Sequence, residues 1–211
     1  MTMIVGIHLD DYVIVAADKR EVMMLGDVVV NVISNKVEKL IEWNGGVITG
    51  SGYVPLLNDL KYYLAENEVN HTGQLLDYAN TAASNIALNQ ASWKKQTNWM
   101  FSYLSQIDDQ RVTRLGYVMS SKVDGTHMLK PMSATIWAKL PDIDTRIKDL
   151  NSQLLPLDSL DQIKENLDYH VSMLKGLFEY AATVDKTVCK DFSYFVQSHH
   201  GFSQLFASGQ A

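Results

Sequence analysis

The sequence predicts an α+β domain in which helices cover packed antiparallel sheets. β-branched runs occur in pairs joined by short turns, which is typical of hairpins. Apolar residues then recur at helical spacing in blocks between the hairpins, instead of alternating with each strand. The 211 residues, 46% of them hydrophobic, suffice for one domain with a substantial core, spanning 1–211.

Hairpin signals dominate the first fifty residues. Asp10-Asp11 separates two β-branched runs, so a two-residue hairpin loop is expected there. Asn44-Gly45-Gly46 predicts a second tight turn, because glycine accepts the positive φ that such turns require. The strand candidates of this part are 4–9, 12–17, 28–33, 36–41 and 47–50.

The hydrophobic period changes to that of helices near Pro55, which suits the first turn of a helix. Thr72 can cap a second helix, and Asp158 or Ser159 is expected to cap a long amphipathic one, whereas 141–155 is ambiguous. Asp124-Gly125 predicts a turn. The strand candidates of this part are 99–104, 114–119, 128–137, 192–197 and 202–206.

The bulk composition argues against several classes of protein. A formal net charge of -6 leaves no basic surplus for a nucleic-acid backbone. No apolar run reaches the roughly 18 residues of a membrane span, and the start of the chain lacks the basic residues of a signal peptide. The single Cys189 precludes an internal disulfide and fits a reducing compartment, so a cytoplasmic protein is expected.

Thr2 is the most informative candidate functional residue. Removal of Met1 would leave a threonine with a free α-amine beside its hydroxyl, which is a nucleophile with its own base. An unperturbed α-amine titrates at about 7.7–8.0, close to working pH. Lys36 is the candidate cation beside that amine, and Asp18 is the carboxylate expected to hold the lysine. Gly50 is the candidate backbone N–H donor to an oxyanion.

Segments within the first 65 residues resemble proteasome β subunits and the bacterial HslV-type peptidases, which belong to the N-terminal nucleophile hydrolase superfamily. The resemblance implies a four-layer αββα sandwich of two antiparallel sheets. It also implies a threonine peptidase that acts on peptides or unfolded proteins, and a ring-shaped homo-oligomer. The segments that carry it are Thr2-Met3-Ile4-Val5-Gly6-Ile7, Val13 to Arg20, Lys36-Val37-Glu38-Lys39-Leu40, and Val47 to Gly52 running into Leu56-Leu57-Asn58-Asp59-Leu60.

The resemblance also implies roles for individual residues. Thr2 matches the nucleophile, Asp18 its buried acidic partner and Lys36 the lysine that tunes the amine. Gly50 matches the oxyanion donor. The remaining matches are Glu21 and Ile48, which fall where the family lines its substrate pocket, and Asp185, which follows a helix as the family's supporting aspartate does.

The second half of the chain departs from that family pattern. No glycine occurs between Gly125 and Gly176, so the family's Gly-Ser-Gly loop before its third helix is missing. Lys186-Thr187-Val188-Cys189 replaces the usual serine-glycine-glycine after the later aspartate. Two alternatives therefore stay open. One is a catalytically inactive assembly subunit of the same fold, and the other is an amidase acting on a small non-peptide amide.

His199-His200 and Cys189 suggest other chemistries. Adjacent residues on a strand point to opposite faces, so the two histidines are not expected to chelate one ion. No metal and no organic cofactor is therefore expected. Cys189 paired with a histidine would be an alternative nucleophile, although a free cysteine more often packs as a small hydrophobe.

Overall fold

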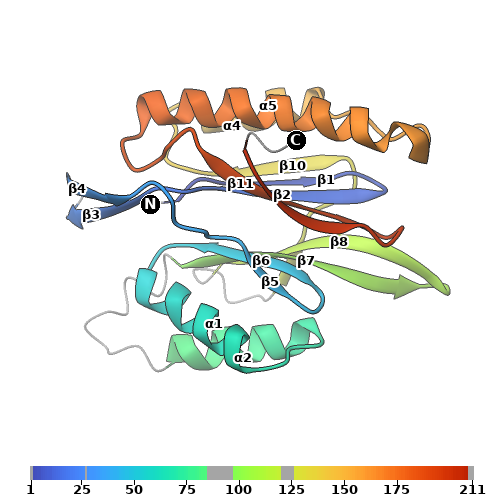
Figure 1. The fold of residues 1–211 in the computed structure, drawn as a ribbon, viewed down its shortest axis with the longest axis horizontal. Coiled ribbons are helices and arrows are strands. Elements are labelled where there is room, and N and C mark those ends of the chain that lie inside the picture. Colours follow the sequence, from blue (N-terminus) through green and yellow to red (C-terminus); the bar gives the residue numbers. More distant parts are fainter. Residues whose placement is uncertain (1, 27, 85–96, 120–125, 209–211) are drawn as a thin grey trace.

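The computed structural model describes residues 2–26, 28–84, 97–119 and 126–208. Two five-stranded antiparallel sheets lie between two layers of helices, and a separate two-stranded ribbon lies at one end (Figure 1). The α+β class predicted from the sequence is therefore confirmed. No helix in the described ranges is long and apolar enough to cross a membrane.

The first sheet has the order β10-β1-β2-β11-β12. Its strands are β1 (Ile4–His8), β2 (Tyr12–Asp18), β10 (Ser133–Trp137), β11 (Phe192–Ser198) and β12 (Ser203–Ala207). The second sheet has the order β5-β6-β7-β8-β9. Its strands are β5 (Ile41–Trp43), β6 (Gly46–Ser51), β7 (Asn98–Ile107), β8 (Gln110–Met119) and β9 (Thr126–Met128). The separate ribbon pairs β3 (Glu21–Leu25) with β4 (Val28–Ser34).

The helices form the outer layers. Helices α4 (Ile143–Ser152) and α5 (Ile163–Val184) cover the first sheet, and the short 3-10 helix η2 (Leu160–Gln162) leads into α5. Helices α1 (Val54–Glu66) and α2 (Thr72–Ser84) cover the second sheet (Figure 1).

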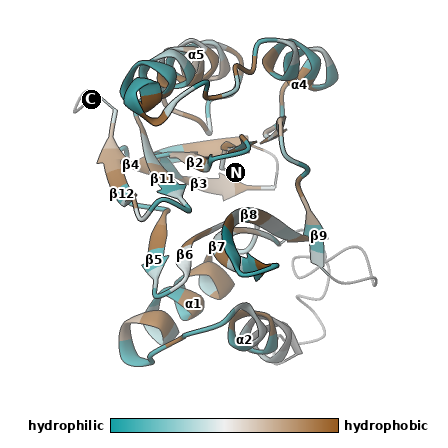
Figure 2. Ribbon diagram, turned by 90° about the vertical axis from the view of Figure 1, so that its right-hand side faces the viewer, coloured by the Kyte–Doolittle hydropathy of each residue, from teal (hydrophilic) through white to brown (hydrophobic). Residues whose placement is uncertain are grey.

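Three apolar clusters hold the layers together. Figure 2 shows hydrophobic residues, in brown, on strands of both sheets. Between α5 and the first sheet, Phe178 stacks on Phe192 with ring centroids 4.5 Å apart. Val15 and Leu115 belong to the cluster between the two sheets. Leu60 of α1 belongs to the cluster beneath the second sheet. Because β1 and β2 are buried on both faces, their sequences read as continuous apolar runs.

The predicted turns of the first fifty residues are confirmed. Leu9 donates its N–H to Tyr12 O at 2.9 Å, which closes the loop of Asp10 and Asp11 between β1 and β2. The second turn joins β5 to β6, where Trp43 pairs with Gly46. Pro55 lies in the first turn of α1, where its missing N–H costs no hydrogen bond.

Two element predictions are wrong, and one strand was missed. Residues 36–40 are not a strand, because β5 starts only at Ile41. The ribbon strand β3 was not predicted, since its side chains do not alternate between core and solvent. Helix α5 begins at Ile163 after η2, so neither Asp158 nor Ser159 caps it. The turn predicted at Asp124-Gly125 lies outside the described residues.

The β3–β4 ribbon carries large apolar side chains in solvent. Leu25 is the most exposed of them, at 78%. A two-stranded ribbon is at best marginally stable in water by itself, and exposed apolar clusters of this kind usually mark contact surfaces. The exposed apolar residues of the ribbon are Met23, Met24, Leu25, Val28, Val30, Val32 and Ile33.

His170 on α5 is fully buried in a polar network that makes the fold sensitive to pH. Asn166 O lies 2.7 Å from its Nδ1, which must therefore carry the proton, and its Nε2 accepts from the Leu155 N–H at 3.3 Å. The neutral ring satisfies both partners. Burial lowers the pKa of His170.

We expect acid to destabilise the protein through His170. A group whose pKa is lower in the folded chain contributes stability that is complete above its unfolded pKa, about 6.5 for histidine. That contribution is lost as pH falls toward the folded pKa. The melting temperature should therefore drop between pH 7 and pH 5, and His170→Gln should make the drop shallower. Circular dichroism melts measure both, and parallel pH profiles would contradict the role given to His170.

Candidate active site

Asp18 is the centre of the candidate site. It is the last residue of β2 and is fully buried. Its N–H donates to Met3 O at 3.2 Å, and its Oδ1 accepts the Met3 N–H at 2.9 Å. Its Oδ2 accepts the Arg20 N–H at 2.9 Å. The carboxylate therefore fixes the backbone at Met3, just before β1, and at Arg20, just after β2. Met3 is the residue that follows Thr2.

Lys39, and not Lys36, is the lysine that pairs with Asp18. Its Nζ lies 2.9 Å from Asp18 Oδ1 and donates to Arg20 O at 2.7 Å. The side chain of Lys39 is only 12% exposed. Lys36 is exposed, and its backbone N–H donates to Ser34 Oγ at 3.0 Å. The predicted ion pair between Asp18 and Lys36 is therefore wrong.

The anchoring of Leu40 explains this difference. Leu40 is buried between the two sheets, and its N–H donates to Glu38 Oε1 at 3.0 Å. These contacts hold Lys39, the residue just before, against the end of β2. The sequence contained one signal for this arrangement. A single strand over 36–41 would place Val37 and Leu40 on opposite faces, so two apolar anchors do not fit one strand face.

Thr2 lies two residues before Ile4, the first residue of β1, and is partly buried. Asp18 Oδ1 accepts from both the Met3 amide and the Lys39 ammonium, so one oxygen atom joins the residue after Thr2 to the lysine. Among the described residues, Lys39 has acceptors for two of its three N–H bonds, which leaves one donor at this position. Because Met1 precedes Thr2, the Thr2 nitrogen is an amide until Met1 is removed.

Gly50 lies in β6 opposite Trp99 of β7. A Cβ at this position would come within 2.6 Å of Leu57 Cδ2 and 2.9 Å of Trp99 Cε3. A side chain at position 50 would therefore have to displace Leu57 of α1 or Trp99 of β7. This packing requirement is separate from any role of its N–H group.

The edge of β6 toward which the Gly50 N–H points follows from strand geometry. Val47 donates its N–H to Ser102 Oγ of β7 at 3.1 Å. N–H groups alternate between the two edges of a strand, so that of Gly50 faces the β5 edge. β5 pairs only with residues Gly46 to Ile48, so this strand does not cover the edge at Gly50. If the pairing of β5 with β6 continued for two residues before Ile41, Lys39 would lie opposite Gly50.

The remaining predicted site residues are Ile48, Glu21 and Asp185, and each has its own local surroundings. Ile48 is 2% exposed and packs beneath the second sheet, so its side chain offers almost no surface to a substrate. Glu21 is partly buried at the start of β3. Asp185 ends α5, and its Oδ1 accepts from the Thr187 N–H at 2.8 Å and the Thr187 hydroxyl at 2.7 Å. Asp185 thus orders its own loop.

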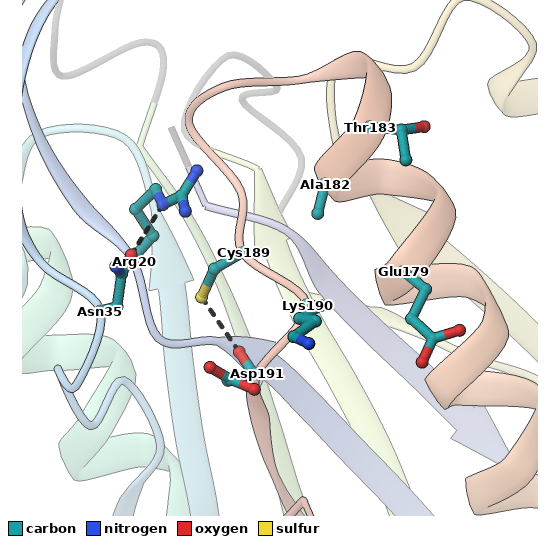
Figure 3. A pocket seen from close by; sticks show the side chains of 8 residues that line it. All are labelled: Arg20, Asn35, Glu179, Ala182, Thr183, Cys189, Lys190 and Asp191. Carbon is teal, nitrogen blue, oxygen red and sulfur yellow. Dashed lines mark hydrogen bonds between the residues drawn. The ribbon is translucent and has the colours of Figure 1, made fainter.

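A cleft of about 460 Å³ lies between the base of the ribbon and the end of α5 (Figure 3). Cys189 lines this cleft, and its Sγ lies 3.2 Å from Asp191 O and 4.0 Å from Asp18 Oδ2. Burial raises the pKa of the Cys189 thiol, so the reactive thiolate is disfavoured. The cleft residues are Arg20, Asn35, Glu179, Ala182, Thr183, Cys189, Lys190 and Asp191.

Asp18→Asn is expected to destabilise the fold by about 3–5 kcal/mol, the usual effect of breaking a buried ion pair from one side. The substitution would leave the Lys39 ammonium uncompensated and turn an amide NH₂ toward a donor. Urea denaturation measures the loss. The matched control is Asp142→Asn, in a pair with Arg146 whose side chains are about a third exposed, where a much smaller loss is expected. Equal losses in both variants would contradict the structural role of Asp18.

Comparison with known proteins identifies the fold. The sequence matches no family profile and none of the curated proteins. In contrast, 344 chains of solved structures match the fold. One is the Gly-1 mutant of Anbu from Hyphomicrobium sp. strain MC1, with a TM-score of 0.66 over 98% of this chain and 87% of that chain. At 12% sequence identity, the likeness shows a shared fold and nothing further.

Proposed function

We propose that this chain is a divergent proteasome-like hydrolase that cleaves peptide bonds with Thr2 after removal of Met1. The observation that carries the proposal is the shared oxygen of Asp18, which holds the Lys39 ammonium beside the backbone that follows Thr2. The fold match to Anbu, which is HslV-like, supports the resemblance seen in the first 65 residues. Lys39, like Lys36, lies within the segment Lys36-Val37-Glu38-Lys39-Leu40 that carries that resemblance.

The proposed reaction uses the first residue as nucleophile and base. The α-amine of Thr2 takes the proton of the Thr2 hydroxyl, and Oγ1 attacks the carbonyl carbon of the substrate. The N–H of Gly50 stabilises the oxyanion that forms. As the C–N bond breaks, the protonated amine gives its proton to the leaving amine. Water then hydrolyses the ester to Thr2, which releases the acid and restores the hydroxyl.

Lys39 acts in this scheme by its charge. An ammonium group close to the α-amine disfavours the protonated form of that amine, so more of it is available as a base at neutral pH. Asp18 positions Lys39 and offsets part of the cost of burying its charge. The roles of Glu21, Ile48 and Asp185 remain predictions from the family resemblance.

The substrate and the assembly state follow from the same proposal. Members of this class act on peptides or unfolded chains inside rings of subunits. The exposed apolar residues of the β3–β4 ribbon provide a surface that neighbouring copies would cover. A ring-shaped homo-oligomer is therefore proposed.

A catalytically inactive assembly subunit is the second candidate. The local engagement of Asp185 with Thr187 favours it, because this carboxylate is committed to its own loop. Such a subunit would keep the fold and the apolar ribbon but would retain Met1.

Intact mass, native mass and peptide hydrolysis on one purified sample test the proposal. The expected result is a chain shortened by Met1, assembled into a closed oligomer, that hydrolyses fluorogenic peptides faster than simple amides. A closed oligomer that retains Met1 and hydrolyses nothing would replace the peptidase by the inactive subunit. Faster cleavage of the simple amides would identify an amidase instead.

A further inference from the structure

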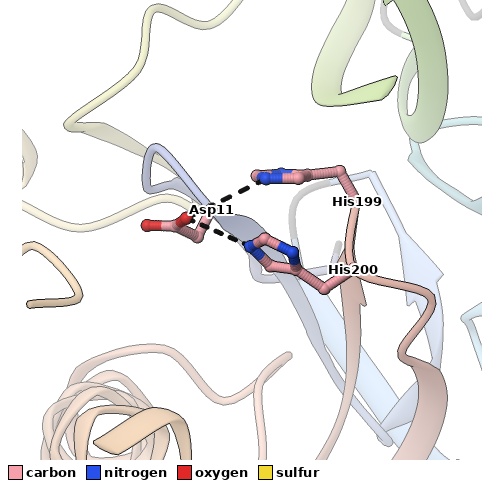
Figure 4. Close-up of side chains that lie close together, drawn as sticks. All are labelled: Asp11, His199 and His200. Carbon is pink, nitrogen blue, oxygen red and sulfur yellow. Dashed lines mark hydrogen bonds and ion pairs between the residues drawn. The ribbon is translucent and has the colours of Figure 1, made fainter. Parts of the chain in front are cut away.

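Two hairpin loops meet at the end of the first sheet that is remote from Asp18. Asp11 lies in the loop between β1 and β2, and His199 and His200 lie between β11 and β12 (Figure 4). The last pair between β2 and β11 is Tyr12 with Ser198. One step further along this register, Asp11 faces His199. The strand pairing itself therefore brings these two loops together.

The turn after β11 directs both histidines to the same side. His200 donates its N–H to Ser198 Oγ at 3.1 Å, and the Gly201 N–H donates to Ser198 O at 3.3 Å. Gly201 has a φ of 92°, which glycine accepts readily. The two imidazole rings lie 4.0 Å apart between centroids. The expectation that neighbouring histidines diverge is wrong here, because they lie beyond the strand and not within it.

The imidazoles converge on one carboxylate oxygen. His199 Nε2 lies 3.9 Å and His200 Nε2 3.4 Å from Asp11 Oδ1 (Figure 4). One nitrogen from each ring and one carboxylate oxygen all lie within 4.8 Å of one another. A small rotation of these side chains would bring all three to coordination distance of one ion, about 2.0–2.2 Å for zinc.

The burial of the cluster suits a metal ligand set. His199 Nδ1 is buried and has no hydrogen-bond partner among the described residues. Side chains of Asp11 and His199 are 28% and 22% exposed, so an ion could enter from solvent.

We propose that Asp11, His199 and His200 form a binding site for a divalent transition-metal ion of the zinc class. Two imidazoles and one carboxylate suit such ions, whereas calcium and magnesium prefer all-oxygen sites. The ion would tie the β1–β2 hairpin to the β11–β12 hairpin. Strand β2 separates this site from Asp18 by about 20 Å at the usual rise per residue. The ion therefore takes no part in the chemistry proposed for Thr2.

Calorimetric titration of the full chain with ZnCl₂ tests the site. One ion per chain is expected, and His199→Gln, His200→Gln and Asp11→Asn should each weaken binding at least about ten-fold. Zinc should also raise the melting temperature of the wild type, since an ion that binds only the folded chain stabilises it. Co²⁺ should give a visible absorption band that the three variants lose.

Two control variants test other possible zinc ligands. His71→Gln removes an exposed histidine near α2, and Cys189→Ser removes the only thiol, so both should bind zinc as the wild type does. Stoichiometric binding that survives in the combined His199→Gln and His200→Gln chain would overturn the site, as would its loss in Cys189→Ser. Absence of saturable binding by the folded wild type would show that the cluster is only a hydrogen-bonded contact between the hairpins.

Discussion

Thr2→Ala is expected to reduce peptide hydrolysis to background, a loss on the order of 10⁶-fold when a covalent nucleophile is removed. The alanine chain keeps its α-amine after Met1 is removed but has no hydroxyl to attack the substrate. Thr2 lies outside β1 and is only partly buried, so the melting temperature should change little. Initial rates on the best fluorogenic peptide measure the effect.

Thr2→Ser is the matched variant, because it restores a hydroxyl without the methyl group. It should retain measurable hydrolysis, and intact mass must show that all three chains have lost Met1. An alanine chain that hydrolyses the peptide at the wild-type rate would remove Thr2 from the mechanism. The fold and the Asp18–Lys39 pair would then need another explanation.

Lys39→Ala is expected to lower the rate at neutral pH by about 10²–10⁴-fold, the range in which positioned acid–base groups contribute. Without the ammonium, the α-amine of Thr2 is protonated more often and accepts the hydroxyl proton less often. Raising the pH should restore part of the rate, because it deprotonates the amine directly. The ratio of mutant to wild-type rates from pH 7 to pH 9 measures this recovery.

Lys36→Ala is the internal control for Lys39. Both lysines lie in the same short segment, but Lys36 is exposed and Lys39 contacts Asp18. The Lys36 variant should hydrolyse peptide as the wild type does. A greater loss in Lys36→Ala than in Lys39→Ala would contradict the assignment. Rates should be compared well below the melting temperature of each variant, since Lys39→Ala also leaves Asp18 buried without its partner.

The local elements of the first half could be predicted because each depends on short-range chemistry. The two-residue loop at Asp10-Asp11 and the early helical position of Pro55 both follow from backbone preferences. The ribbon strand β3 could not be predicted in this way, because its side chains do not separate into a buried and an exposed face.

The identity of the lysine could not be predicted from spacing alone. Asp18 follows from the end of a clearly apolar strand, but the path from β4 to β5 is irregular and depends on Leu40 reaching the core between the sheets. Gly50 also has a packing role that the sequence did not indicate. Its lack of a side chain makes room for Leu57 and Trp99, which come from elements far apart in the sequence.

The two contacts at Asp18 Oδ1 span 15 and 21 residues of sequence. The first forms once the β1–β2 hairpin has closed, whereas the second also needs the segment ahead of β5 to dock. In a nascent or half-folded chain, the Thr2 hydroxyl would therefore lack the Lys39 ammonium that Asp18 holds in the folded protein. The proposed chemistry is thus switched on by completion of the tertiary structure, which would protect neighbouring polypeptides during synthesis.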